Sequence, residues 1–278
     1  MKEEINSKSL YPYRSLSQES MSLLEWDTLK SHLSSFASTK MGKKAILEFE
    51  IPLEYDDSKR LLRETIEINE LEKNLDKSIS FSGVFDISKS IDICSKGGVI
   101  TSSDLLEIAE TIFASRELKK ILLDFELRPF ISSFFNPLVD HSQIEKFLKI
   151  GIESNGRISD GASEKLAKLR QALLAKKSER RILVEKFIQK NTNYIQDTTV
   201  GDRYGRPVLA IKVQFADKFK GIIHDSSSSG NTIYLEPESI VLKGNKIASL
   251  EAKVSGEEFK LLKEWSQIIR DNYKTLID

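Results

Sequence analysis

The three residue types of a hydrolase triad stand next to one another at His224-Asp225-Ser226. A triad works when nucleophile, base and orienting acid form a relay of hydrogen bonds. Neighbouring residues in an extended strand point to opposite faces, so these side chains do not form that relay. We therefore predict no catalytic residue. We expect instead that Asp225 and the following serines satisfy backbone groups of a turn, with Gly230 or Asn231 at positive φ.

The serine-rich run Ser226–Asn231 has a second interpretation as a phosphate-binding turn. Its hydroxyls and backbone N–H groups could hold phosphates without reading sequence, helped by basic side chains nearby. The candidate nucleic-acid contacts are Lys176, Lys177, Arg180, Arg181, Arg203, Arg206, Lys218, Lys220, Ser226, Ser227, Ser228 and Ser229. A turn without a ligand is the alternative. Tyr204, Phe219 and Tyr234 either stack on bases or belong to the core.

Other chemistry has no motif in the chain. No Gly-x-x-x-x-Gly-Lys-Ser/Thr loop is present, and no Gly-x-Gly-x-x-Gly follows a strand, so we expect no nucleotide cofactor in these residues. The single cysteine, Cys94, excludes an internal disulfide framework and a cysteine-based zinc site. The three histidines, His32, His141 and His224, are far apart in sequence, so we predict no metal site.

Composition and charge limit the kinds of partner that we expect for this protein. No apolar run approaches the length that spans a bilayer and the N-terminus has no apolar signal core, so we expect a cytoplasmic protein without a membrane partner. The chain carries 42 basic and 42 acidic residues, yet Ser163–Lys190 holds nine Lys or Arg against three Glu. This basic segment is either a solvated helical face or a surface that faces a polyanion.

The elements that position these residues are mostly helical. Residues 1–20 are typical of a flexible tail, and residues 21–162 of a helical core whose amphipathic segments bury their apolar faces against one another as a bundle. Asn155-Gly156 predicts a small hairpin near 151–159.

A two-helix arm follows the core. Residues 163–193 predict an ascending helix, 194–246 a β-rich segment, and 247–278 a returning antiparallel helix. If the two helices run antiparallel from the β-rich segment, Arg180 and Arg181 would lie beside Glu257 and Glu258. Opposite charges there would fix the register of the two helices. The predicted fold class is therefore mainly α with a small β domain: a helical bundle plus an antiparallel arm that carries the β-rich segment at its tip.

Two stretches closely resemble the clamp region of the second bacterial MutS branch, MutS-II: Gly205–Val213 and Phe219–Pro237. Supporting stretches are Leu24–Leu29, Lys96–Leu106 and Ile158–Leu166, so the resemblance covers roughly residues 20–278. It implies the N-terminal part of such a protein, with a helical core, a lever and a clamp. The ATPase, with its ATP and Mg²⁺, and the Smr-type endonuclease would lie outside these 278 residues.

The resemblance also implies partners. MutS-II proteins act on branched DNA and suppress homologous recombination, and they function as homodimers. A further role of the family, recognition and splitting of collided ribosomes, makes ribosomal RNA the alternative target. A module that binds only protein, including a second copy of itself, is the other alternative. In each case we expect this segment itself to have no enzymatic activity.

Overall fold

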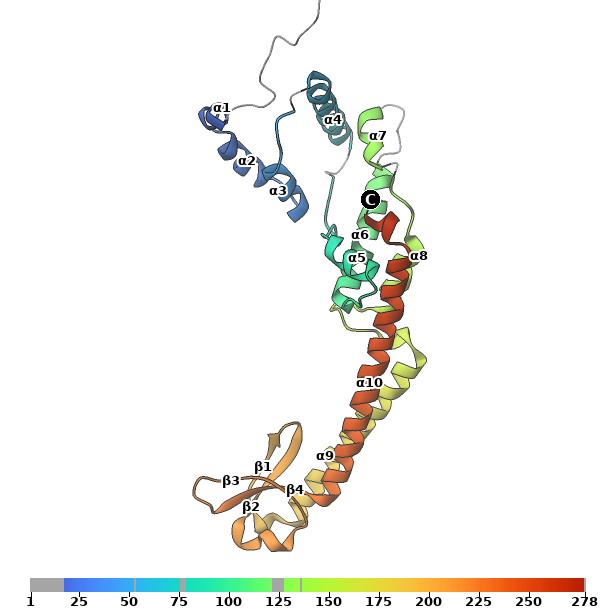
Figure 1. Ribbon diagram of the computed structural model, residues 1–278. Coiled ribbons are helices and arrows are strands. Elements are labelled where there is room, and N and C mark those ends of the chain that lie inside the picture. The colour runs from blue at the N-terminus through green and yellow to red at the C-terminus, as the bar shows by residue number, and fades with distance from the viewer. Residues whose placement is uncertain (1–17, 53, 76–78, 122–127, 136, 278) are drawn as a thin grey trace, which may run out of the picture. The chain divides into compact units, whose positions relative to one another are not determined.

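The computed structural model describes residues 18–52, 54–75, 79–121, 128–135 and 137–277 (Figure 1). They are mainly helical with one small four-stranded antiparallel sheet, which confirms the predicted fold class at that level. The chain divides into two compact units, of which the second is Ile158–Lys263. Of the predicted tail, residues 1–17 lie outside the described residues. In the described part of the chain, no helix is long and apolar enough to cross a membrane.

The first unit takes the described residues up to Arg157 and those from Glu264 onward. Its helices are α1 (Gln18–Leu23), α2 (Trp26–Ser34), α3 (Lys40–Leu47), α4 (Tyr55–Lys73), α5 (Ser88–Ser95), α6 (Ser102–Ile121), α7 (Pro129–Phe135), α8 (Ser142–Gly151), the last turns of α10 and α11 (Tyr273–Ile277).

The core of the first unit is built around α6. Leu105 and Ile108 of α6 are fully buried, and α6 packs on α8. Trp265, from the last turns of α10, is also buried and meets the ring of Phe147 of α8 edge-on at a centroid distance of 6.1 Å. Segments far apart in sequence therefore share one core.

The helices near the start of the described chain pack differently. No side chain of α2 or α3 is buried, and Leu29, Leu33 and Phe36 are exposed. Apolar side chains of α5, α6 and α8 are buried, as predicted. The prediction is wrong for most of α4, where Leu62, Ile66 and Ile68 are exposed, and for α2 and α3. For α2 and α3 the reason is that α2 packs mainly on α3, and two helices this short do not cover each other's apolar faces.

The expected hairpin at Asn155-Gly156 is a tight turn. The N–H of Glu153 donates to the carbonyl of Arg157, and the glycine N–H donates to the carbonyl of Glu153, both at 2.8 Å. Single bridge residues, Ile152 and Ile158, stand on its two sides in place of longer strands.

The second unit pairs two long helices, α9 (Glu164–Lys190) and α10 (Glu238–Asp271), which run side by side in opposite directions (Figure 1). Ser163 caps α9, because its Oγ accepts a hydrogen bond from the N–H of Leu166 at 3.3 Å. The sequence of α9 contains no Gly or Pro, so no residue breaks the helix before Lys190.

The register of the helix pair differs from the predicted one. Glu258 pairs with Arg170 at 2.6 Å and Glu257 with Lys165 at 2.6 Å, so the predicted pairing with Arg180 and Arg181 is wrong. The cause is the start of the returning helix, since α10 begins nine residues before the predicted residue 247. Every position of α10 therefore meets an earlier part of α9.

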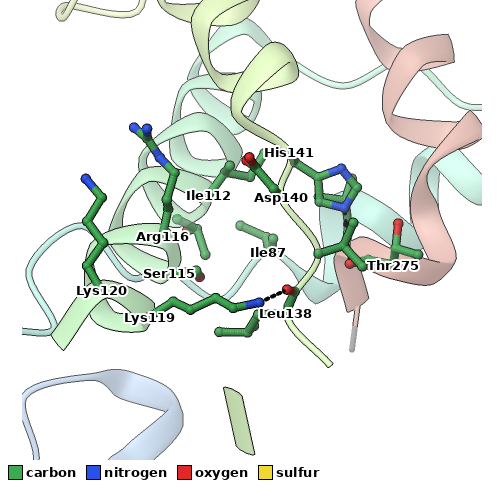
Figure 2. Close-up of a pocket in the computed structure, with 13 residues that line it drawn as sticks. Ile87, Ile112, Ser115, Arg116, Lys119, Lys120, Leu138, Asp140, His141 and Thr275 are labelled. Atoms are coloured by element: carbon green, nitrogen blue, oxygen red, sulfur yellow. Dashed lines mark hydrogen bonds between the residues drawn. The ribbon is translucent and has the colours of Figure 1, made fainter. Parts of the chain in front are cut away.

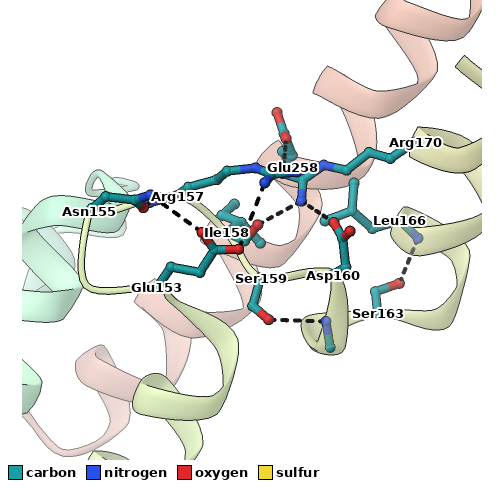
Figure 3. A network of polar contacts seen from close by, with 11 residues as sticks. Glu153, Asn155, Arg157, Ile158, Ser159, Asp160, Ser163, Leu166, Arg170 and Glu258 are labelled. Atoms are coloured by element: carbon teal, nitrogen blue, oxygen red, sulfur yellow. Dashed lines mark hydrogen bonds and ion pairs between the residues drawn. The ribbon is translucent and has the colours of Figure 1, made fainter. Parts of the chain in front are cut away.

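Arg170 ties together the end of the arm at which α9 begins (Figure 3). Its guanidinium donates to the carbonyl of Ile158 at 2.7 Å, to the carboxylate of Asp160 and to Glu258. Burial alone would lower the pKa of Arg170, but the hydrogen bonds to Asp160 and Glu258 outweigh it and raise the pKa. The three groups that Arg170 contacts come from the loop before α9 and from α10, so it holds these segments in one arrangement.

The sheet is inserted between α9 and α10. Its strands are β1 (Ile195–Arg203), β2 (Arg206–Lys212), β3 (Gly221–Ser226) and β4 (Thr232–Pro237), in the spatial order β1-β2-β4-β3. All neighbouring strands are antiparallel. A 3₁₀ helix over Val213–Lys218 connects β2 to β3.

One face of the sheet packs on the helices through an apolar cluster. Its buried members are Val184, Ile195, Leu209, Ile211, Ile233, Leu235 and Ile240. Ile240 belongs to α10, in a stretch that the sequence assigned to the β-rich segment ending at residue 246. The helix forms there despite its β-branched residues, because a helix can bury Ile240 in this cluster and local propensity is the weaker effect.

Candidate nucleic-acid interface

A buried carboxylate anchors the sheet. Glu236 of β4 is 0% exposed, and its Oε1 lies 3.3 Å from Nη1 of Arg206 on β2. Its Oε2 lies 3.0 Å from Nε2 of His224 on β3. Arg206 also donates to Oδ1 of Asn245 on α10 at 2.7 Å. Because a buried charge is tolerated only when it is paired, these contacts hold three strands and one helix together.

A glycine in α10 makes room for this network. A Cβ at Gly244 would lie 2.6 Å from Nη1 of Arg206, so any other residue here would require the guanidinium to shift. No sequence pattern predicted the network. The available signals were a Glu at the end of an apolar strand and a Gly inside a helical segment, and neither indicates which Arg would meet them.

The run His224-Asp225-Ser226 forms no relay. His224 contacts Glu236, whereas the carboxylate of Asp225 lies 3.7 Å from Arg203 and also accepts the N–H of Ser226 at 2.8 Å. The histidine and the aspartate therefore contact different partners and not each other. Within the described residues, no three His, Cys, Asp or Glu side chains gather as metal ligands would.

The serine turn is closed by its own side chains. Ser227 accepts the N–H of Thr232 on its Oγ at 3.1 Å and donates its own N–H to the carbonyl of Thr232 at 2.9 Å. Gly230 takes φ +70°, as predicted. Ser226, Ser228 and Ser229 are exposed. The hydroxyls of Ser227 and Ser229 also lie 3.3 Å apart, so both are used within the turn, which leaves the exposed Ser226 and Ser228 for contacts outside it.

Two of the predicted basic contacts lie over aromatic rings. The Lys218 ammonium is 4.5 Å from the ring centroid of Tyr194, and the Arg203 guanidinium is 4.8 Å from that of Tyr234. Such cation–π contacts orient a charge while leaving it able to meet an anion. Lys220, two residues after Lys218, is exposed.

The basic residues of α9 are mostly paired with carboxylates. Lys176 lies 2.6 Å from Glu179, Lys177 lies 2.7 Å from Glu251, and Arg181 lies 3.7 Å from Glu185. The hydrogen bond from Lys176, followed by that from Lys243, lowers the pKa of Glu179 to about 2. The positive charge of this segment is thus largely balanced by the structure's own acids.

Arg180 is placed differently. Its Nη1 donates to the carbonyl of Gly205 at 3.4 Å, in the turn between β1 and β2. Together with Lys177, Arg206 and Tyr204 it lines a groove of about 330 Å³ between that turn and the two helices. Lys176 and Arg181 stay paired on α9 outside this groove. The other predicted contacts fall into three places: this groove, the Lys218 loop, and the end of β3 with Arg203 and the serine turn.

The first unit contains a separate cavity of about 400 Å³ (Figure 2). Its walls combine apolar side chains with Arg116, Lys119, Lys120 and His141. The Lys119 ammonium reaches across to the carbonyl of Leu138 at 2.7 Å. No motif in the sequence indicated this cavity, because its residues come from α6, the segment before α8, and α11.

Fold and surface together define a module in which a helix pair carries a small sheet edged with basic and hydroxyl side chains. No family model matches the chain. It is similar to proteins named Endonuclease MutS2, with 30% identity over 251 residues to that of Synechocystis sp. and 29% over 260 residues to that of Finegoldia magna. Identity to that of Clostridium perfringens is 30% over 256 residues.

These similarities cover most of this chain but only part of each relative. They span 90%, 92% and 90% of the chain, and 30%, 33% and 32% of the three relatives in the same order. The chain thus spans about a third of the length of the curated relatives it matches, and is similar to one segment of them.

Proposed function

We propose that this chain is the core, lever and clamp segment of a MutS2-like protein, and that its sheet contacts branched DNA. The observation that carries the proposal is the similarity along 90% of the chain to proteins named as endonucleases, whose substrates are nucleic acids. In this proposal the segment has no catalytic residue. ATP, Mg²⁺ and the nuclease belong to other domains of a cytoplasmic homodimer that suppresses homologous recombination.

The surface of the second unit supports contact with phosphates. Lys218, Lys220 and Arg203 lie on the sheet side of the helix pair with the exposed serines of the turn. Lysine, arginine and serine side chains position a nucleic acid through its backbone and carry no sequence information. This suits a target recognised by its shape, as a branched DNA is.

The helix pair supports a mechanical role. Helix α10 is continuous from the sheet at Glu238 to the first unit at Asp271, and Arg170 fixes α10 to the start of α9. A continuous helix braced by such contacts can pass a displacement along its length. We propose that nucleotide-driven motion reaches the sheet by this route.

The experiment is a salt series of binding constants for branched DNA, linear duplex and ribosomes. Phosphate contact predicts that the logarithm of affinity falls linearly with the logarithm of salt. The double substitution Lys218→Glu/Lys220→Glu should weaken binding to branched DNA and reduce the magnitude of the slope by about 2. Lys43→Glu/Lys146→Glu, two exposed lysines of the first unit, is the matched control and should change little.

Equal loss in the two double variants would contradict a contact at the Lys218 loop. Tighter binding to ribosomes than to branched DNA at every salt concentration would replace DNA as the target. Absence of binding to all three, with retained self-association, would favour a module that binds only protein.

A further inference from the structure

The turn between β1 and β2 holds an unusual residue. Arg203 pairs with Arg206, so the hairpin closes through the two residues Tyr204 and Gly205, with φ +55° and +76°. Two positive φ values define the turn type in which Asn-Gly is strongly preferred. A tyrosine at the first position is strained, because its Cβ crowds the backbone in the left-handed region.

The fold gives no reason for this tyrosine. Its side chain is 99% exposed, so it contributes no burial that would offset the strain. The turn is held by another residue, since Oδ1 of Asp202 accepts the N–H of Gly205 at 3.0 Å. A strained residue that the surrounding structure holds in place, and that stabilises nothing itself, points to a contact outside the chain.

The other aromatic side chains near the sheet are already covered. Arg203 lies over the ring of Tyr234, and Phe219 packs on Phe187 and Tyr194 at centroid distances of 5.5 and 5.7 Å. Of the three aromatic residues considered for stacking, only Tyr204 presents its ring to solvent.

A cation, Arg180, lines the same groove as Tyr204. Arg180 touches the backbone of the turn through the carbonyl of Gly205, and in the described part of the chain no carboxylate lies within ion-pair distance of it. The other cations of the groove already form ion pairs, Lys177 with Glu251 and Arg206 with Glu236. Two carboxylates also line the groove: Glu251 is paired with Lys177, and Asp202 accepts the N–H of Gly205. Arg180 is therefore the cation of the groove that can meet an anion, and a single cation suits one phosphate better than the phosphate row of a duplex.

We propose that Tyr204 stacks on one unpaired nucleobase while Arg180 binds the adjacent phosphate. The inference rests on the proposed function and deepens it, because it gives the hairpin the task of detecting unpaired nucleotides at a branch. An aromatic ring accepts any base, since every base has a π-face. The same turn would find no open base face in an intact duplex, where each base is stacked between its neighbours.

The test uses the substitution Tyr204→Asn in the full chain. Asparagine is the residue that this turn type prefers, so Y204N should unfold at the same or a higher temperature than the parent. The probes are a fluorescein-labelled single-stranded oligodeoxyadenylate and an abasic strand of the same length, which keeps the phosphates and lacks the bases. Y204N should bind the adenylate roughly tenfold more weakly and the abasic strand unchanged. Y204F keeps the ring and should bind both strands as the parent does.

Arg180→Gln separates the two halves of the contact. It should weaken binding to both strands equally, while the neighbouring Arg181→Gln should weaken neither, because Arg181 faces Glu185. A 2-aminopurine placed in the strand reports stacking directly, and its fluorescence should be quenched by the parent and not by Y204N.

Two results distinguish a failure of the stacking inference from a failure of the proposed DNA contact. Equal affinity of the parent for the adenylate and the abasic strand, or of Y204N and the parent for the adenylate, overturns stacking and leaves phosphate contact standing. Absence of binding to either strand at low salt, and to branched DNA as well, overturns both.

Discussion

The arm and the sheet of the second unit are stabilised in different ways. Along α9 and α10, pairs such as Lys177–Glu251 and Lys243–Glu179 cross between the helices at 2.7 and 2.6 Å, and all four side chains are partly exposed to solvent. The sheet buries Leu209 completely and keeps the Glu236 carboxyl group out of solvent, in contact with Arg206 and His224. Exposed ion pairs select a register at small free energy, whereas burial supplies stability.

The geometry of the sheet depends on buried contacts, whereas the helix pair depends in part on ion pairs that are exposed to solvent. The strands that present Tyr204 and Arg203 are fixed by a shared core and by the Glu236 network. The arm buries Leu166, Ile247 and Val254, and it is also held by ion pairs that water and salt can replace. Because those ion pairs lie between the helices, their loss should leave the geometry of an interface carried by the sheet unchanged.

The largest expected effect comes from Arg206→Met. This change leaves the Glu236 carboxylate buried without its arginine and should lower the free energy of unfolding by about 3 kcal/mol, measured by urea denaturation with circular dichroism. The double variant Arg206→Met/Glu236→Gln removes the unpaired charge and should recover part of the loss. A single variant as stable as the parent would show that the network does not anchor the sheet.

Arg170→Met should have a smaller effect. The Arg170 side chain is 13% exposed and its charged hydrogen bonds lie at the edge of the arm, so we expect a loss of about 2 kcal/mol in the same measurement. Hydrogen exchange should increase in the first turns of α9 and not in β2 or β4. Faster exchange in the strands would mean that the sheet depends on Arg170 as much as the arm does.

The smallest effect is a pH dependence of the arm. The pKa of Glu179 is lowered to about 2, chiefly by the hydrogen bond from Lys176, so its stabilising contribution is complete above the ordinary glutamate pKa. That contribution decreases as the pH falls from about 4.5 towards 2. Glu257 acts in the same direction, since Lys165 lowers its pKa.

Glu179→Gln should flatten the acid limb of a stability-against-pH curve recorded by thermal unfolding. Glu185→Gln, at an exposed glutamate of the same helix, is the control. If the stability of Glu179→Gln falls with acid as that of the parent does, the ion pairs of Glu179 do not stabilise the register of the helix pair.

Part of the site was predictable from sequence because it depends on local chemistry. The alternation in Arg206–Val213 and the turn before Thr232 predicted strands and a serine turn, and the positive φ of Gly230 follows from the same turn chemistry. The packing of α2 and α3 was not predictable in this way. An amphipathic pattern indicates an apolar face and does not say whether another element covers it.

The sequence alone determined that two long helical segments flank a β-rich one, and that neighbours in the run His224-Asp225-Ser226 point to opposite faces. It did not determine that α10 begins at Glu238, inside the segment predicted as β-rich. Tertiary structure decided the register of α9 against α10, because it depends on where the sheet returns the chain and not on the helices themselves. It also decided the pairing of Arg206 and His224 with Glu236. Tertiary structure also decided that, of Tyr204, Phe219 and Tyr234, only Tyr204 presents its ring to solvent. The reason is that exposure depends on the elements that pack around a residue.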